Sequence, residues 1–154
     1  MKDMEYMQLA LEEARKAFEL DEVPVGALVV KGGIILSRTH NLMEALQDPT
    51  AHAEVLAIKE AADKLESWRL EGATLYVTKE PCPMCAGAIV NARLSRVVYG
   101  CRDDRGGAVD SLYHILSDKR LNHQTEVVSE VLSEESAGLL RSFFRGKRKR
   151  AMEL

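Results

Sequence analysis

Two short stretches of the chain hold residue types that could together bind a catalytic metal ion. The first stretch is Thr50–Glu54 and the second is Glu80–Cys85. Within them, His52, Cys82 and Cys85 offer one imidazole and two thiolates, which are ligands that zinc prefers. A catalytic zinc ion takes three protein ligands and leaves its fourth tetrahedral position to water. The two stretches therefore predict a catalytic zinc site, provided that the fold brings them together.

Glu54 supplies a spare carboxylate beside this ligand set. Residues two apart do not share a helix face, so Glu54 is expected beside the metal and not as a fourth ligand. A carboxylate in that place can take a proton from metal-bound water and pass it to a substrate. A His-x-Glu triplet alone is a weak signal, but followed by Pro-Cys-x-x-Cys it is the pattern of zinc-dependent nucleobase deaminases.

A Cys-x-x-Cys pair also occurs in redox proteins and in structural zinc sites. A structural site normally has four protein ligands, and the other candidates for a fourth ligand are Cys101 and the remaining histidines: His40, His114 and His123. We expect these histidines at the surface or hydrogen-bonded in loops, and Cys101 as a small buried residue. Catalytic zinc is favoured, and a non-catalytic zinc module that binds RNA or protein stays open as an alternative.

The elements that must position these residues follow from hydrophobic spacing and turn chemistry. Strands are predicted at residues 25–30, 34–39, 73–78, 96–99 and 125–129, and the first two should form a hairpin around Lys31–Gly33. Helices are predicted at residues 4–18, 51–65, 82–92 and 133–147, with a short one at 111–116. Thr50 is the expected N-cap of the second helix, and Pro81 the expected start of the third. The alternation predicts an α/β layered protein with a mixed sheet, as one domain over residues 1–154.

Composition is that of an ordinary globular protein, with 46% apolar and 29% charged residues. The first residues lack the apolar core of a secretory signal, and no apolar run approaches the roughly 18 residues that span a membrane. An odd cysteine count without a signal argues for a reducing compartment and against a disulfide framework. We therefore expect a cytoplasmic protein with no membrane association.

Charge is unevenly distributed along the chain. The net charge is −3, which does not suggest a general nucleic-acid binder. The last residues, 141–154, nevertheless carry Arg141, Arg145, Lys147, Arg148, Lys149 and Arg150 against Glu153 alone. A basic end on an acidic body could contact phosphates, and it could equally be the solvated end of a helix.

Beyond the metal motif, the chain closely resembles the bacterial tRNA-specific adenosine deaminases of the cytidine deaminase-like superfamily. The similar blocks are residues 22–26, 40–42, 49–54, 68–78, 80–87, 96–100, 122–123 and 142–145. The resemblance implies a three-layer α/β/α sandwich with a mixed five-stranded sheet, and a homodimer. It also implies hydrolysis of adenosine to inosine at the wobble position of a tRNA anticodon loop.

The resemblance also implies roles for individual residues. It makes His52, Cys82 and Cys85 the ligands of Zn²⁺ and Glu54 the catalytic proton shuttle. The substrate contacts that it implies are Asn41, Asp103 and Phe144. By residue type alone, an Asn or Asp in a loop is more often a turn residue, and a Phe is usually part of the core.

Three features depart from the pattern of that family. Lys79 stands where an apolar residue is expected, Cys101 stands where a small residue is usual, and the loop at 101–110 is more charged. The loop helps to choose the RNA, so these departures concern the substrate and not the zinc chemistry. A free nucleobase or nucleotide deaminase that acts on guanine, cytosine or deoxycytidylate is therefore the alternative within the superfamily.

Overall fold

A mixed five-stranded sheet forms the centre of the structure, a computed structural model that describes residues 1–153. The strands are β1 (Gly26–Lys31), β2 (Ile34–His40), β3 (Ala73–Lys79), β4 (Arg96–Cys101) and β5 (Glu126–Val128). They lie in the order β2-β1-β3-β4-β5. Strand β1 is antiparallel to both β2 and β3, whereas β3, β4 and β5 are parallel. The carboxyl ends of β2, β3 and β4 therefore meet at one edge of the sheet.

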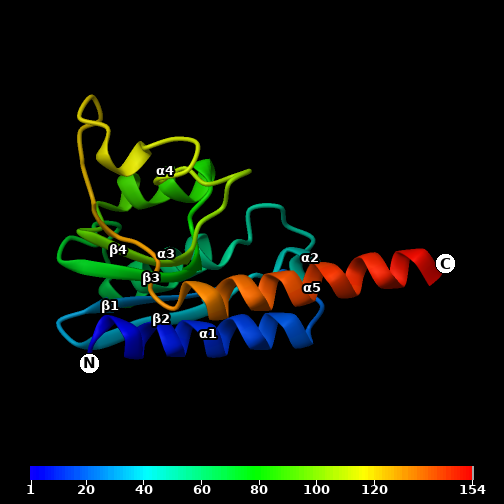
Figure 1. The fold of residues 1–154 in the computed structure, drawn as a ribbon. Coiled ribbons are helices and arrows are strands. Elements are labelled where there is room, and N and C mark those ends of the chain that lie inside the picture. The colour runs from blue at the N-terminus through cyan, green and yellow to red at the C-terminus, as the bar shows by residue number, and fades with distance from the viewer. Residues whose placement is uncertain (154) are drawn as a thin grey trace.

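Helices cover both faces of this sheet (Figure 1). Helices α1 (Asp3–Glu19) and α5 (Ser133–Glu153) lie side by side on one face, and α3 (Ala53–Leu65) and α4 (Pro83–Ala92) cover the other. One apolar core fills the space between the sheet and α3 and α4, and a smaller one lies under α1. The predicted three-layer α/β/α sandwich and the β1–β2 hairpin are confirmed.

The start of α3 differs from the prediction. Thr50 is not its N-cap, because the Thr50 amide and hydroxyl both donate to Asp48 Oδ1, at 2.8 and 2.7 Å. His52 holds the N-cap position instead, and the helix begins at Ala53. Local bonding between Thr50 and Asp48 forms a turn that competes with capping, and the start of the helix shifts by two residues.

The start of α4 also lies later than predicted. Cys82 holds the N-cap position and Pro83, not Pro81, is the first helical residue. Proline suits this first position because its missing N–H would have no helical partner. The shift leaves Cys82 just outside the helix and Cys85 in its first turn.

Three further boundaries differ from the expected ones. A short helix, α2 (Met43–Leu46), forms between β2 and α3, where no helix was predicted. Its first amides, those of Glu44 and Ala45, donate to the buried Glu22 carboxylate at 2.9 and 2.7 Å. The helix predicted at 111–116 is a single 3-10 turn, η1 (Ile115–Ser117). Helix α5 continues past its predicted end to Glu153.

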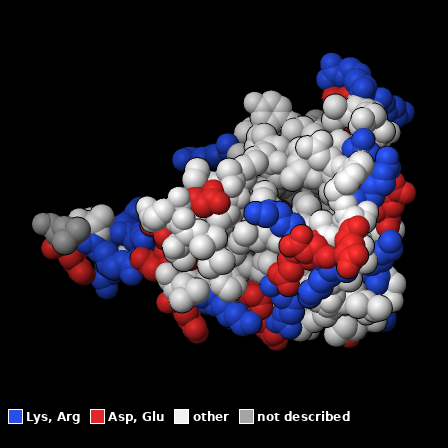
Figure 2. All heavy atoms as spheres, turned by 180° about the vertical axis from the view of Figure 1, so that it is seen from behind, with Lys and Arg blue, Asp and Glu red and all other residues white. Residues whose placement is uncertain are grey.

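The C-terminal half of α5 projects away from the sandwich and carries most of the basic residues noted in the sequence (Figures 1 and 2). Two of them, Lys147 and Arg150, each lie 3.0 Å from a carboxylate oxygen of Asp21. Within residues 1–153, no helix combines the length and the apolar character needed to cross a membrane.

Candidate metal centre and active site

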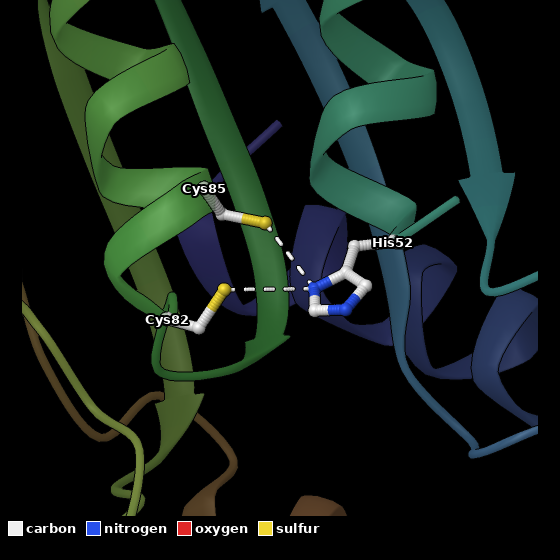
Figure 3. Close-up of side chains that lie close together, drawn as sticks. All are labelled: His52, Cys82 and Cys85. Atoms are coloured by element: carbon white, nitrogen blue, oxygen red, sulfur yellow. Dashed lines mark hydrogen bonds between the residues drawn. The ribbon is translucent and has the colours of Figure 1, made fainter. Parts of the chain in front are cut away.

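The residues predicted to bind zinc meet at the sheet edge where β2 and β3 end. His52 follows β2 at the start of α3, and Cys82 and Cys85 follow β3 at the start of α4 (Figure 3). Both sulfurs point toward Nδ1 of His52, at 3.6 Å from Cys82 and 3.4 Å from Cys85. One potential ligand atom from each residue lies within 4.8 Å of the others.

These separations fit a tetrahedral zinc ion. Zinc–sulfur and zinc–nitrogen bonds of about 2.3 and 2.0 Å, meeting at the tetrahedral angle, place sulfur and nitrogen about 3.5 Å apart. The two observed distances lie on either side of that value. Across the described part of the chain, this group of three is the one cluster of His, Cys, Asp and Glu close enough to hold a metal ion, and it does not include Cys101.

The two thiols are not equivalent. The interaction between the two side chains lowers the pKa of Cys82 to about 4 and raises the pKa of Cys85. The interaction with Cys82 also raises the pKa of His52. Metal ligation requires both thiolates and a neutral imidazole. The cluster therefore already favours the thiolate at Cys82, and a bound cation would have to displace the proton of Cys85.

A cavity of about 210 Å³ opens beside this cluster. Val23, Val25 and Met43 form an apolar part of its wall. Its polar and aromatic lining comprises Asn41, His52, Glu54, Lys79, Glu80, Cys82, Asp103 and Phe144. The structure thus brings around one cavity every residue that was predicted to bind zinc, shuttle protons or contact the substrate, except Cys85. Cys85 is buried, and its sulfur faces His52. The volume suits a single nucleobase-sized group.

Glu54 combines burial with access to this cavity. Its side chain lies in the first turn of α3, is only 4% exposed and lines the cavity beside the metal cluster. Burial raises the pKa of the Glu54 carboxyl, because the charged form loses solvation. A carboxyl with a raised pKa holds a proton more readily than a solvent-exposed one, which suits a proton shuttle.

Asn41 joins the cavity wall to the start of α3. Its Oδ1 accepts a hydrogen bond of 2.7 Å from the Ala53 amide, one of the amides that the helix leaves without a partner. This bond identifies which side-chain atom is the oxygen. Within residues 1–153, Nδ2 makes no hydrogen bond, and Asn41 lines the cavity.

Glu80 organises the loop that follows β4, a role that the sequence reasoning missed. Its carboxylate is 2% exposed and accepts amide hydrogen bonds from Asp103, Val109, Asp110 and Ser111, at 2.8 to 3.1 Å. Burial opposes ionisation, but these bonds and one from the Ser111 hydroxyl together lower its pKa to about 2. The signal that could have indicated this role is the position of Glu80, an acidic residue two positions before Cys82 of the Cys-x-x-Cys motif.

Asp103 and Phe144 reach the cavity from its two remaining sides. Asp103 stands on the loop after β4, and its Oδ2 lies 3.1 Å from the Lys79 ammonium. Phe144 comes from α5, is 42% exposed and packs edge-on against the buried Phe143. One of the two phenylalanines is therefore core, as residue type suggests, and the other forms part of the cavity rim.

The remaining histidines and Cys101 lie outside this site. His40 Nδ1 is 3.0 Å from a Glu13 oxygen, His123 bonds the Leu94 carbonyl at 2.7 Å, and His114 is exposed. Cys101 is buried at the end of β4. The expectation is confirmed for His114, His123 and the buried Cys101, whereas His40 is the half-buried last residue of strand β2 and not a loop residue.

A His–Cys–Cys group that could hold a metal ion at the helix starts of an α/β/α sandwich, with a buried Glu beside it, is typical of the zinc-dependent deaminases. The model of the MafB19-like deaminase family matches residues 1–148, and the chain belongs to that family. It is 55% identical to the tRNA-specific adenosine deaminase of Bacillus subtilis over 145 residues, which cover 94% of this chain and 90% of that protein. Its place in the family is therefore among the tRNA-specific adenosine deaminases.

Two solved structures bear on the fold and the site. One comes from work on A-to-I editing by tRNA:A34 deaminases at the wobble position; it is 47% identical with a TM-score of 0.85, and the match covers 88% of this chain and 99% of that one. The other is a guanine deaminase from Bacillus subtilis, 38% identical with a TM-score of 0.64 and 66% coverage of each chain. This chain matches the first structure over nearly the whole length of that structure, and the second over about two thirds of its length.

Proposed function

We propose that this protein converts adenosine to inosine by hydrolysis at the wobble position of a tRNA anticodon loop. The observation that carries the proposal is a buried Glu54 beside a His–Cys–Cys cluster in one nucleobase-sized cavity. The similarity to tRNA-specific adenosine deaminases over 94% of the chain supports the choice of substrate. A tRNA substrate also agrees with the cytoplasmic location expected from the sequence.

The reaction replaces an amine by an oxygen. Water adds at C6 of adenine, the C6–N bond to the amino group breaks, and inosine and ammonia are the products. A zinc ion held by His52, Cys82 and Cys85 would supply a water of lowered pKa as the nucleophile. The Glu54 carboxylate would take one proton from the water and give it to the ring nitrogen N1, which keeps it in inosine. It would then carry the proton of the added hydroxyl to the leaving amine, so that C6 becomes a carbonyl and ammonia departs.

Other residues of the cavity bind and orient the base in this proposal. The Nδ2 donors of Asn41 face the target nucleotide, while Oδ1 stays on the α3 amide. Phe144 offers an aromatic face at the rim, and stacking on such a face is a common way to hold an unpaired base. Asp103 would lie along the path of the RNA.

A free nucleobase deaminase is the second candidate. The similarity to a guanine deaminase over two thirds of the chain favours it, and the metal cluster and Glu54 serve either substrate. The two substrates would have to be distinguished at the rim of the cavity, where Asp103 comes from the loop after β4 and Phe144 from the last helix, α5. These segments are the part of the site that a longer substrate would contact.

The proposal includes a homodimer. A second groove, of about 320 Å³, lies between α3 and α4 and has a nearly apolar wall: Val55, Ile58, Ala62, Trp68, Ala88 and Ala92 are among its residues. Trp68 is 59% exposed at its edge. Because α3 and α4 also carry the metal cluster, a second copy seated here would adjoin the active site without covering the cavity.

The proposal is tested with zinc-loaded protein and an anticodon stem-loop RNA that has adenosine at the wobble position. We expect inosine with the wild-type chain. Glu54→Ala should retain its zinc and its fold but lose turnover by at least about a hundredfold, because general acid–base catalysis contributes that much. Glu54→Ala with undiminished turnover would contradict the assigned role, and a wild-type chain that leaves the RNA unchanged would contradict the proposed substrate.

A further inference from the structure

Lys79 places a positive charge on the wall of the active-site cavity. It is the last residue of β3, opposite Cys101 in the parallel ladder to β4. Its Nζ lies 3.1 Å from Oδ2 of Asp103, and the two side chains are 31% and 20% exposed. Among the described residues that line the cavity, Lys79 is the one lysine or arginine.

Asp103 does not need Lys79 to hold its position. Asp103 Oδ1 accepts hydrogen bonds from the amides of Arg105 and Gly106, at 3.1 and 3.2 Å. Its own amide donates to Glu80. The loop therefore fixes Asp103 from both ends, and the contact with Lys79 is an additional one that can be exchanged.

Lys79 in turn is only partly satisfied by this contact. An ammonium group has three N–H donors and no acceptor. Across residues 1–153, Asp103 is the one residue whose carboxylate forms an ion pair with the Lys79 ammonium. At least two donors of a partly exposed ammonium at the cavity wall are thus available to an incoming anion.

The other charged side chains around the cavity favour an anion-binding group at this place. Its other charged side chains, Glu54, Glu80 and Asp103, are all acidic. A nucleic acid carries one negative charge per nucleotide and would be repelled by an uncompensated acidic rim. A free base carries no phosphate and would not depend on a cation at this place.

We propose that Lys79 is a specificity-determining residue that contacts a backbone phosphate of a nucleotide next to the one in the cavity. This inference rests on the proposed function, because it requires a strand that runs across the rim. In the free protein the ammonium pairs with Asp103. When RNA binds, the ammonium moves to the phosphate and releases Oδ2 of Asp103 for a hydrogen-bond donor of the substrate, such as a ribose hydroxyl.

The test measures binding of the anticodon stem-loop by zinc-loaded protein in the Glu54→Ala background, over a series of salt concentrations. Lys79→Leu should weaken binding at low salt by several-fold to about tenfold. It should also reduce the slope of log Kd against log salt by about 0.7 to 1, the effect of losing one phosphate contact. Lys79→Arg should keep the wild-type slope.

Two controls isolate the phosphate contact. Lys31→Leu makes the same charge change at the opposite end of the sheet, because Lys31 pairs with Ala73, the first residue of β3. It should leave the slope unchanged. In an Asp103→Asn background, Lys79→Leu should still weaken binding by the same factor if Lys79 contacts the RNA itself.

The outcomes separate this inference from the proposed function. If the wild-type protein deaminates the hairpin but Lys79→Leu does not change the salt dependence of binding, the role of Lys79 alone is overturned. If Lys79→Leu no longer weakens RNA binding in the Asp103→Asn background, Lys79 only neutralises the charge of Asp103. That result would also overturn the proposed phosphate contact. A wild-type chain that neither binds nor deaminates the hairpin would overturn both proposals.

Discussion

At the scale of single residues, the buried carboxylate of Glu80 determines the shape of the active-site loop. Four backbone amides converge on it from residues 103 to 111. The fit is close, because a Cβ added at Gly107 would lie 2.4 Å from the Glu80 carboxyl carbon. Glu80 therefore positions Asp103 and the rest of this loop.

Glu80→Gln should destabilise the protein by about 2 kcal/mol at neutral pH. The amide keeps the shape of the side chain but places N–H donors against backbone N–H donors. The pKa of Glu80 is lowered from 4.5 to about 2, so the charged carboxylate stabilises the folded state, and the neutral amide loses this stabilisation. Urea denaturation of both proteins measures the difference. The exposed Glu19→Gln is the matched control and should change the free energy of unfolding by less than about 0.5 kcal/mol.

The pH dependence of this difference has a defined sign. The folded-state pKa of Glu80 is below the unfolded value, so its stabilisation is present above about pH 4.5 and is lost as the pH falls toward 2. The gap in stability between wild type and Glu80→Gln should therefore narrow over that interval. A gap that stays constant from pH 7 to pH 3 would show that the carboxylate charge is not what holds the loop.

The cluster of His52, Cys82, Cys85 and Glu54 could be found from sequence because its chemistry demands these residue types at close spacing. The surroundings could not be found in this way. The Lys79–Asp103 pair and the bonds of Glu80 join residues 23 or more positions apart, and only the register of β3 and β4 brings them together. Lys79 and Asp103 were each noted in the sequence, but the pairing of the two was not predicted.

At the scale of elements, the site depends on how closely α1 packs against the sheet. Gly26 opens β1 directly beneath this helix, and a Cβ added there would lie 2.0 Å from the Ala10 carbonyl oxygen and 2.6 Å from the Ala14 amide nitrogen. Both are backbone atoms, which cannot rotate away. Gly26 also donates its amide to Thr78, so β1 and β3 are tied at the end of the sheet that bears the cavity.

Gly26→Ala should therefore lower the free energy of unfolding by about 3 kcal/mol, because α1 must move away from β1. The matched control is Gly138→Ala in α5, where an added Cβ meets nothing closer than 3.8 Å. That change should be neutral or stabilise by up to about 1 kcal/mol through helix propensity. Equal unfolding midpoints in urea for the two variants would refute the close α1–β1 contact.

Element types were predictable from spacing, but the starts of the two ligand-bearing helices were not. Thr50 has the side chain of a good N-cap, yet it bonds Asp48, and Asn41 caps α3 from twelve residues away. Helix α2 likewise depends on Glu22, which is distant in sequence. In each case a tertiary partner decides where the helix begins, and hydrophobic periodicity carries no information about such partners.

At the scale of the whole molecule, the apolar groove between α3 and α4 predicts self-association. Trp68→Glu should raise the dimer dissociation constant by about 30-fold, because an exposed interface Trp typically contributes 2 kcal/mol or more. Sedimentation velocity over a range of concentrations measures this. Tyr113→Glu changes an aromatic residue of similar exposure, 57%, on a different surface and should leave association unchanged.

Two results would contradict this assignment of the interface. A wild-type chain that stays monomeric at every concentration would remove the dimer itself. A dimer that is weakened by Tyr113→Glu but not by Trp68→Glu would place the interface elsewhere on the molecule.

The central claim is that the cavity beside His52, Cys82 and Cys85 deaminates adenosine within RNA. The most direct measurement offers the zinc-loaded protein a mixture of the anticodon stem-loop with free guanine, cytosine and adenosine, and follows all products together. We predict inosine in the hairpin and no conversion of the free compounds over the same interval. Conversion of a free base with an unchanged hairpin would contradict the claim and would assign the same metal chemistry to a free nucleobase deaminase.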